Sequence, residues 1–190
     1  MTLEESSIRS EELFQGKLLH AYRDEVRLPD GDTSIREWIK HPGASAVVPL
    51  FEDGRTMLVR QFRFPPRREF LEVPAGKLDH HGESAEAVAL RELEEETGWR
   101  AGKVIHLGSF YPCIGYSNEI IHFYLARGLE KGRQDLQHGE FMEVMSLAFT
   151  DALELLRRGE ILDMKTATAL NLAERFLEDE ARETEAKGFR

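Results

Sequence analysis

Four glutamates crowd into the segment from Glu92 to Glu96, directly after Arg91. On a helix, Glu92, Glu95 and Glu96 would share one face, because residues three and four positions apart are neighbours. Like charges at these spacings destabilise a helix by roughly a few tenths of a kcal/mol per pair, so three stacked carboxylates need a compensating positive charge. Carboxylate oxygens suit Mg²⁺ or Mn²⁺. The segment therefore predicts a site for a hard divalent cation.

Small apolar residues indicate which way this face points. Ala85, Val88 and Ala89 precede the glutamates on the same helical face. Such residues usually mark the side of a helix that packs against the protein. We therefore expect the carboxylates to face a cleft. The alternative is a solvated acidic face, which is the commoner outcome for an acidic run taken by itself.

Length and composition limit the classes of protein to consider. The chain has 190 residues, 41% of them hydrophobic, and a net charge of -10. This length fits one globular domain, or one domain with a small appendage. The acidic balance argues against a nucleic-acid partner, and the single Cys113 argues against a disulfide framework. A polar N-terminus and the lack of an 18-residue apolar run predict a cytoplasmic protein without a membrane partner.

The order of predicted elements is β-rich, helix, β-rich, helix, which favours an α/β fold with a mixed sheet and helices on its faces. We expect strands at 14–28 and 33–40, a hairpin of 44–51 with 56–64, and further strands at 70–73, 103–111, 119–126 and 141–148. Helices are expected between an N-cap at Ser84 and a stop at Gly98, and at 149–158 and 164–180. The domain prediction is an N-terminal β element over 1–42, a main domain over 43–180 and a disordered tail over 181–190.

The residues around the glutamates resemble the Nudix box. Glu83, Arg91, Glu92, Leu93, Glu95, Glu96, Gly98 and Trp99 fit its pattern, and seven residues separate Glu83 from Arg91 as in that pattern. Between Gly76 and Glu83 there are six residues instead of five. The additional residue falls in a loop with His80 and His81, which have no spacing to a third metal ligand. The helical carboxylates stay in register.

Flanking motifs resemble one branch of this family, the ADP-ribose pyrophosphatases and related nucleoside diphosphate sugar hydrolases. The motifs are REW at 36–38, VRQFR at 59–63, LEVPAGKLD at 71–79, YSNE at 116–119 and GEFMEV at 139–144. The resemblance implies hydrolysis of the diphosphate bridge of a nucleotide sugar, with ADP-ribose the leading substrate and GDP-mannose the next. It also implies an α/β/α sandwich, divalent cations, and a homodimer in which the N-terminal antiparallel strands meet the partner subunit.

Metal ligands follow from the spacing and from the resemblance. Glu92 and Glu96, one turn apart, are the first candidates, and the family likeness adds the carbonyl of Ala75 and Glu95. Arg91 precedes Glu95 by four residues, so it could hold that carboxylate in place. Without the motif, a surface ion pair worth under about 1 kcal/mol would be the simpler interpretation of Arg91.

A general base is expected on a loop that closes over the substrate, and the loop at 135–143 offers two glutamates. Glu140 corresponds best to the loop glutamate that acts as base in the ADP-ribose branch. Glu143, Glu119 and Glu95 remain open as alternatives.

Arg63 is the leading diphosphate anchor, because a guanidinium offers two parallel hydrogen bonds to phosphate. Arg60 lies on the opposite strand face and is interpreted as structural. Trp38 could stack on the nucleobase or pack in an interface. The matching motifs also nominate Arg36 and Glu119 for substrate binding.

Glu72 lies beside the predicted metal loop and could touch water or substrate. Two other functions stay open for the whole chain. One is a dinucleotide or cap pyrophosphatase, and the other is a Nudix-fold sensor that binds a nucleotide without cleaving it. The intact glutamate set argues against the sensor.

Overall fold

The computed structural model describes residues 2–79 and 82–188 and divides into two compact units. The N-terminal unit comprises Met1–Gly43 with Tyr111–Ile120, and the central unit comprises Ala44–Phe110 with Ile121–Arg190. The first boundary lies within one residue of the one predicted after residue 42. The segment at 111–120, however, belongs with the N-terminal unit although it is distant in sequence.

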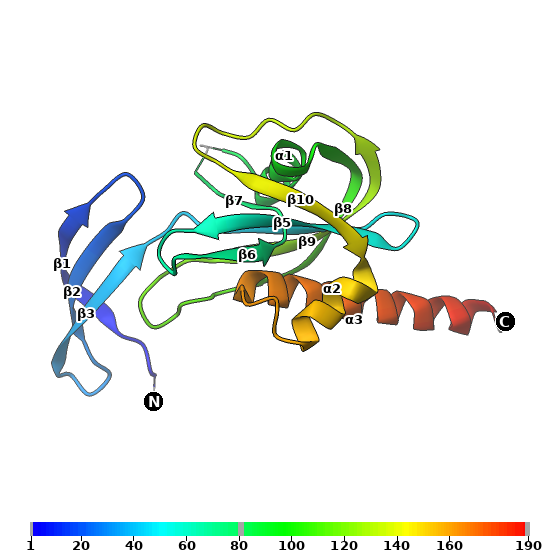
Figure 1. Ribbon diagram of the computed structural model, residues 1–190. Coiled ribbons are helices and arrows are strands. Elements are labelled where there is room, and N and C mark those ends of the chain that lie inside the picture. Colours follow the sequence, from blue (N-terminus) through cyan, green and yellow to red (C-terminus); the bar gives the residue numbers. More distant parts are fainter. Residues whose placement is uncertain (1, 80–81, 189–190) are drawn as a thin grey trace. The chain divides into compact units, whose positions relative to one another are not determined.

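The N-terminal unit is built on a three-stranded antiparallel sheet in the order β1-β2-β3 (Figure 1). Its strands are β1 (Ser6–Gln15), β2 (His20–Arg27) and β3 (Thr33–Lys40). The antiparallel strands and the third strand's bounds are confirmed. The single strand expected at 14–28 is wrong, because a turn closed by the bond from Gly16 N to Leu19 O separates two strands. All residues of β1 are exposed, so no apolar alternation marks this strand in the sequence.

The central unit contains seven strands among its described residues, arranged as two sheets. One sheet has the order β7-β4-β9-β8 and the other the order β10-β5-β6. The strands are β4 (Ala44–Pro49), β5 (Arg55–Arg63), β6 (Arg68–Glu72), β7 (Ala75–Lys77), β8 (Trp99–Phe110), β9 (Ile121–Lys131) and β10 (Met142–Ala148). Because β4 pairs parallel with β9 while the other pairs are antiparallel, the mixed sheet is confirmed.

The predicted hairpin of 44–51 with 56–64 is wrong. β4 pairs with β7 and β9, whereas β5 pairs with β6 and β10. Only a bridge between Leu50 and Thr56 joins the two segments near their turn. Every residue of β4 is buried, and both of its edges are occupied, so this apolar strand serves as the centre of a sheet.

Helices cover both sides of the four-stranded sheet, as Figure 1 shows. Helix α1 (Ala85–Thr97) packs Ala89 and Leu93 against Val47, Tyr124 and Ala126. Helices α2 (Phe149–Arg157) and α3 (Met164–Gly188) lie on the other side. They close a larger apolar cluster that includes Val48, Leu58, Phe123, Leu125, Phe149, Leu170 and Ala173. The expected α/β/α sandwich is confirmed.

Helix α3 runs further than the sequence suggested. Residues 181–188, expected to be disordered, continue the helix that was expected to end at 180. Pairs of opposite charge four residues apart, Arg182 with Glu178 and Lys187 with Glu183, line this extension, and such pairs each add a few tenths of a kcal/mol. Within the described part of the chain, no helix is long and apolar enough to cross a membrane.

Candidate metal and phosphate site

Helix α1 begins and ends where its sequence signals predict. The Ser84 hydroxyl accepts a hydrogen bond from Ala87 N, and Gly98 ends the helix in the left-handed conformation, with φ 74°. Both are standard devices for satisfying the backbone groups at helix ends. Of the predicted ligands, Glu92 is 8% exposed and Glu96 is 5% exposed. The predicted inward orientation is therefore confirmed for Glu92 and Glu96, whereas Glu95 is partly exposed.

The two buried carboxylates meet the backbone at the start of β7. Ala75 N donates a hydrogen bond of 3.2 Å to Glu96 Oε2. A Cβ added to Gly76 would lie 1.9 Å from Glu92 Oε1, so only glycine leaves room for that carboxylate. The predicted ligands Ala75, Glu92 and Glu96 are thus brought together, although Ala75 precedes Glu96 by 21 positions.

These carboxylates carry more negative charge than their surroundings compensate. Burial, reinforced by the charge of Glu92, raises the pKa of Glu96 to about 8. Burial also raises the pKa of Glu92, although Arg91 opposes this. Buried carboxylates normally depend on a counter-charge or a metal ion. The donor set therefore fits a divalent cation with oxygen ligands.

Arg91 is the nearest counter-charge and contacts three carboxylates. Its guanidinium lies 3.1 Å from Glu83, 2.8 Å from Glu92 and 3.0 Å from Glu95. The predicted pairing of Arg91 with Glu95 is therefore present, and Glu83 joins it despite the additional loop residue. His80 and His81 lie outside the described residues. Among those described, no group of three or more metal-ligating side chains is placed to hold an ion.

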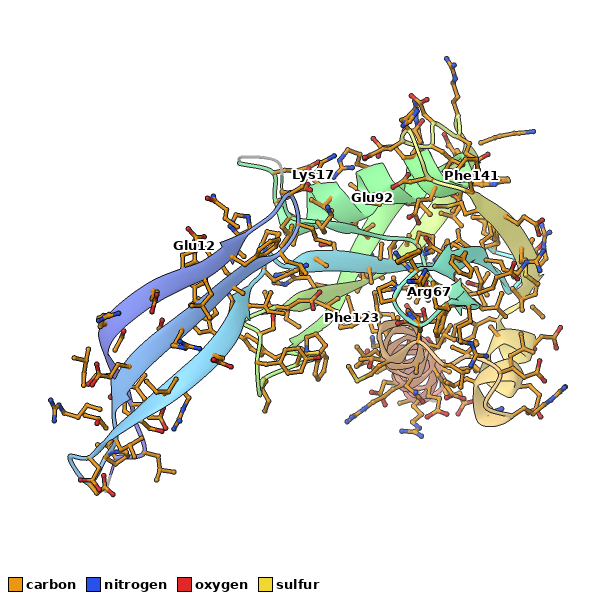
Figure 2. The ribbon with its side chains drawn as sticks, turned by 60° about the vertical axis from the view of Figure 1, so that its left-hand side comes forward. Glu12, Lys17, Arg67, Glu92, Phe123 and Phe141 are labelled. Carbon is orange, nitrogen blue, oxygen red and sulfur yellow. The ribbon has the colours of Figure 1, made fainter. Side chains whose placement is uncertain are left out.

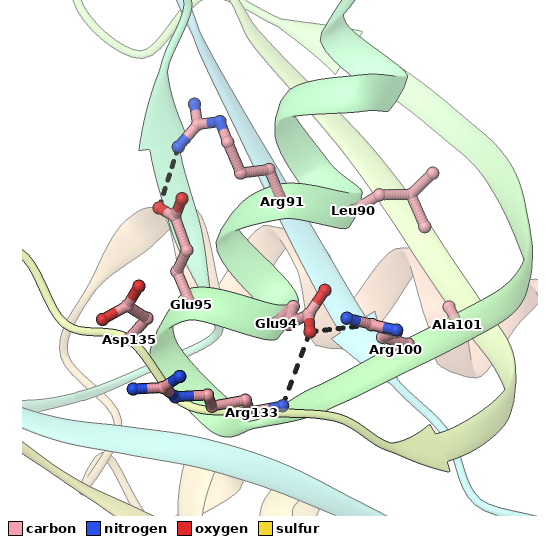
Figure 3. A pocket seen from close by; sticks show the side chains of 8 residues that line it. All are labelled: Leu90, Arg91, Glu94, Glu95, Arg100, Ala101, Arg133 and Asp135. Carbon is pink, nitrogen blue, oxygen red and sulfur yellow. Dashed lines mark hydrogen bonds and ion pairs between the residues drawn. The ribbon is translucent and has the colours of Figure 1, made fainter.

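A hollow of about 540 Å³ borders the same helix on another side. Figure 3 shows its lining residues, with dashed contacts from Arg91 to Glu95 and from Glu94 to Arg100. Arg91 and Glu95 line it, whereas the buried Glu92 and Glu96 do not. The hollow therefore flanks the carboxylate site without containing it.

The loop that follows β9 is attached to the C-terminal end of α1. Gln134 Nε2 donates to Glu96 O at 2.7 Å, and Asp135 N donates to Glu95 O at 3.0 Å. These bonds satisfy carbonyls that a helix end leaves without partners. Figure 2 labels Glu92 on α1 and Phe141 on the segment before β10. The root of the predicted base loop is thus fixed to the helix that carries the carboxylates.

The two loop glutamates have different surroundings. Glu140 is exposed and its Oε2 accepts a bond of 3.0 Å from Gln137 N. Burial is the main cause of the raised pKa of Glu92 and Glu96, and the charge of Glu140 adds to it in both cases. Glu143 instead pairs with Arg60 at 2.6 Å across β10 and β5. Only Glu140 is therefore electrostatically linked to the buried carboxylates.

Arg63 is paired with a second buried carboxylate. Its Nε and Nη2 donate to Glu72 at 2.7 and 2.6 Å, and Glu72 is 2% exposed. Lys165 Nζ reaches the same carboxylate at 3.1 Å and Asp163 at 2.9 Å. Burial would raise the pKa of Glu72, but Arg63 and Lys165 together hold it below its usual value.

Sequence reasoning missed the contribution of Asp163, Lys165 and Thr166. Asp163 accepts a bond from Thr166 N at the start of α3, and this N-cap spacing is a signal that the sequence does contain. Lys165 had no such signal, since it is 93 positions from Glu72. Their role depends on the tertiary fold.

The remaining predicted substrate residues lie in the N-terminal unit. Trp38 is half-buried and stacks on Tyr22, with ring centroids 5.1 Å apart. Arg36 makes two hydrogen bonds to Glu5, of 2.9 and 2.6 Å. Glu119 lies 3.6 Å from His41. Each side chain has a partner within its own unit, and their roles toward substrate stay predictions.

The sandwich, its glutamate helix and the glycine beside it define a Nudix-type domain. Residues 40–167 match the family described as NUDIX domain, and residues 7–39 match the nucleoside diphosphate sugar hydrolase N-terminal domain. The chain therefore belongs to the Nudix family, in the branch that carries this N-terminal domain. Nudix hydrolases generally use divalent metal ions.

Individual relatives agree with this assignment. An ADP-ribose pyrophosphatase from Bacillus subtilis (strain 168) is 44% identical over 89% of this chain and 92% of its own length. A GDP-mannose pyrophosphatase from Yersinia enterocolitica is 33% identical over 92% of this chain and 97% of its own. The crystal structure of an ADP compounds hydrolase matches 96% of this chain and 99% of its own with a TM-score of 0.84. At 20% identity, that match shows a shared fold.

Proposed function

We propose that this protein hydrolyses the diphosphate bridge of nucleoside diphosphate sugars to a nucleoside monophosphate and a sugar phosphate. ADP-ribose is the leading substrate and GDP-mannose the next, in line with the names of the relatives. The observation that carries the proposal is the pair of buried carboxylates, Glu92 and Glu96, placed against Ala75 and Gly76 without full charge compensation.

Mg²⁺ is the proposed ion, with Mn²⁺ as the alternative, and Glu92, Glu95, Glu96 and the Ala75 carbonyl would hold it. When bound, the ion would neutralise phosphate charge and favour ionisation of a water molecule. Three carboxylates and a carbonyl are the hard oxygen donors that Mg²⁺ prefers. Arg91 would then share Glu95 with the ion and keep that side chain oriented.

Arg63 is proposed to anchor the diphosphate. Glu72 occupies its Nε and Nη2, and none of the described residues accepts a hydrogen bond from Nη1. A guanidinium fixed along one edge presents its remaining N–H groups in a defined direction. The charge of Glu96 also contributes to the raised pKa of Arg63, after the larger effect of its hydrogen bonds to Glu72. This electrostatic influence supports a place for the anchor near the proposed metal ligands.

Glu140 is proposed as the general base that takes a proton from the attacking water. It is exposed, and its charge adds to the raised pKa values of Glu92 and Glu96, which are mainly due to burial. Among the described residues, its side chain accepts a single hydrogen bond, from the backbone N–H of Gln137 in its own loop. Glu143 is paired with Arg60, and Glu95 with Arg91. Those two carboxylates would have to break an ion pair before accepting a proton.

A homodimer is proposed to complete the nucleoside pocket, with Trp38, Arg36 and Glu119 on the substrate side. The three-stranded sheet exposes several apolar side chains that a partner subunit could cover, among them Ile8, Leu13, Phe14 and Ile35. Exposed apolar patches often mark an interaction site, so these side chains support the proposed dimer. A monomer in sedimentation at assay concentration would contradict the dimer.

A substrate panel tests the function directly. ADP-ribose, GDP-mannose, UDP-glucose and a dinucleoside polyphosphate are compared with and without Mg²⁺, and monophosphate release is measured. We expect Mg²⁺-dependent release from ADP-ribose to be fastest. Tight nucleotide binding without turnover on any compound would contradict the enzyme hypothesis and favour a nucleotide-binding sensor.

A further inference from the structure

The first turn of α3 contacts two parts of the proposed site. One is the backbone just before Ala75, a proposed metal ligand, and the other is Glu72, the partner of the proposed diphosphate anchor Arg63. Asp163 caps this helix by accepting a hydrogen bond of 2.9 Å from Thr166 N. Thr166 is fully buried, and the side chain of Lys165 is 15% exposed. Both are held close to β6 and to the loop that follows it, although 93 positions separate each residue from its contact there.

Thr166 fixes the backbone that leads into the metal site. Its hydroxyl donates to Asp163 at 2.6 Å and accepts a bond of 2.9 Å from Val73 N. Pro74 has no N–H, and Ala75 N binds Glu96. The available N–H groups of residues 73–75 are therefore all engaged, one by the α3 turn and one by a candidate metal ligand. A buried N–H that loses its partner costs about 1–3 kcal/mol, so this arrangement is strongly specified.

Lys165 acts on the proposed diphosphate anchor Arg63 through Glu72. Its ammonium bridges Glu72 and Asp163, at 3.1 and 2.9 Å. Glu72 in turn holds Arg63 by two hydrogen bonds. Two acidic and two basic side chains thus balance one another, and removal of Lys165 would leave a surplus of buried negative charge that competes for Arg63.

We propose that Thr166 and Lys165 are positioning residues with separate tasks. Thr166 sets the 73–75 backbone, and with it the Ala75 carbonyl, for the divalent cation. Lys165 sets the orientation of Arg63 for the diphosphate. The inference rests on the proposed function, and neither residue touches reacting atoms. Outer partners of this kind typically change metal affinity or activity by about 10–100-fold when removed.

The proposed role of Thr166 is tested by measuring metal binding without substrate. Thr166→Val keeps the side-chain shape but removes the hydroxyl, Thr166→Ser restores it, and Thr168→Val is the matched control. Thr168 lies on the same helix, and its hydroxyl makes no hydrogen bond with the described residues. Titration of Mn²⁺ by electron paramagnetic resonance should show affinity about tenfold weaker in Thr166→Val. The serine and control variants should stay within about twofold of wild type.

The proposed role of Lys165 is tested by measuring the binding of a diphosphate. Lys165→Met is compared with Lys165→Arg, which keeps the charge. At saturating Mn²⁺, calorimetric affinity for ADP should fall about tenfold in the methionine variant, and KM for ADP-ribose should rise by a similar factor. Because the charge of Lys165 also acts on Glu96, Mn²⁺ affinity should change far less than ADP affinity in the methionine variant, and it should stay unchanged in the arginine variant. The arginine variant should recover most of the ADP affinity.

Opposite outcomes would overturn the inference. The proposal fails if Thr166→Val leaves Mn²⁺ affinity unchanged, or if Thr166→Ser does not restore it. It also fails if the Thr166 and Lys165 variants change Mn²⁺ and ADP affinity equally. In each case the first turn of α3 would have a purely structural role. If Thr166→Val does not fold, Thr166→Ala leaves space for a water at Val73 N and takes its place. If wild type binds Mn²⁺ and ADP but hydrolyses no nucleotide sugar, the proposed function fails while both binding tests still decide the inference.

Discussion

Two groups of buried carboxylates lie in the central unit, and their pKa values move in opposite directions. Burial and the neighbouring Glu92 raise the pKa of Glu96 to about 8. Glu72 is as deeply buried, yet Arg63 and Lys165 hold its pKa below the ordinary value. The same chemistry therefore serves two ends. A carboxylate that is hydrogen-bonded to two cations supports the fold, whereas one whose burial and negative neighbour outweigh the charge of Lys165 is suited to an added cation.

The largest expected effect is on turnover. Glu96→Gln keeps the side-chain size but removes the charge that would hold the divalent cation, so kcat for ADP-ribose should fall by at least about a hundredfold. Steady-state assays over a Mg²⁺ series measure this. Glu94→Gln is the control, because Glu94 lies on the same helix and pairs with Arg100. Turnover within about threefold of wild type would remove Glu96 from the metal site.

The second effect is on stability and concerns Glu72, the carboxylate that is paired with Arg63 and Lys165. Glu72→Gln leaves Arg63 and Lys165 without their shared buried partner, which should lower the free energy of unfolding by about 3 kcal/mol. Urea denaturation monitored by circular dichroism measures the change. Glu69→Gln, on the same strand and exposed, is the control. An equal loss in both variants would show that burial does not distinguish these carboxylates.

A smaller effect of the opposite sign is expected for Glu96→Gln without metal. The folded-state pKa of Glu96, about 8, lies above the reference value of 4.5, so the folded protein binds an additional proton between these pH values. Stability of the metal-free wild type from this group is therefore lost as pH rises from about 4.5 to about 8. At pH 8.5 in EDTA, Glu96→Gln should raise Tm by about 2 °C or more, which corresponds to roughly 1 kcal/mol.

Repeating the measurement at pH 5 and with Mg²⁺ sharpens the comparison. The advantage of Glu96→Gln should shrink at pH 5, where wild-type Glu96 is largely protonated, and should reverse when Mg²⁺ stabilises only the wild type. For Glu72 the pH dependence of stability is the reverse, because its pKa is lower in the folded than in the unfolded protein. Ionised Glu72 therefore stabilises the fold at pH values above its unfolded-state pKa, and this contribution is lost as the pH falls. A Tm difference that does not depend on pH would refute the charge imbalance at Glu96.

The smallest effect is expected for the exposed ion pairs of β5. Arg60→Met removes contacts to Glu69 and Glu143, both more than half exposed, and should change stability by less than about 1 kcal/mol. Turnover should stay near wild type. Thermal unfolding and the ADP-ribose assay measure both. A large loss of turnover would return Glu143, which Arg60 holds, to consideration as the general base.

Local patterns explain what the sequence by itself determined. The bounds of α1, its caps at Ser84 and Gly98, and the inward direction of Glu92 and Glu96 all depend on residues within a few turns of one another. Helical periodicity and capping operate over that range. The Nudix resemblance identified the family from the same segment. Strand β1 was missed for the complementary reason, since it buries no apolar face.

Only the tertiary structure decided which strands pair and which charges are balanced. Nothing near Glu72 in the sequence indicates that Lys165 will bind it, and nothing near Val73 points to Thr166. Hydrogen bonds and charge compensation depend on distances in space, and these contacts join residues 93 positions apart. The sequence therefore determined the carboxylates of the site, while the fold decided which of them lack a counter-charge and which segments hold the site in place.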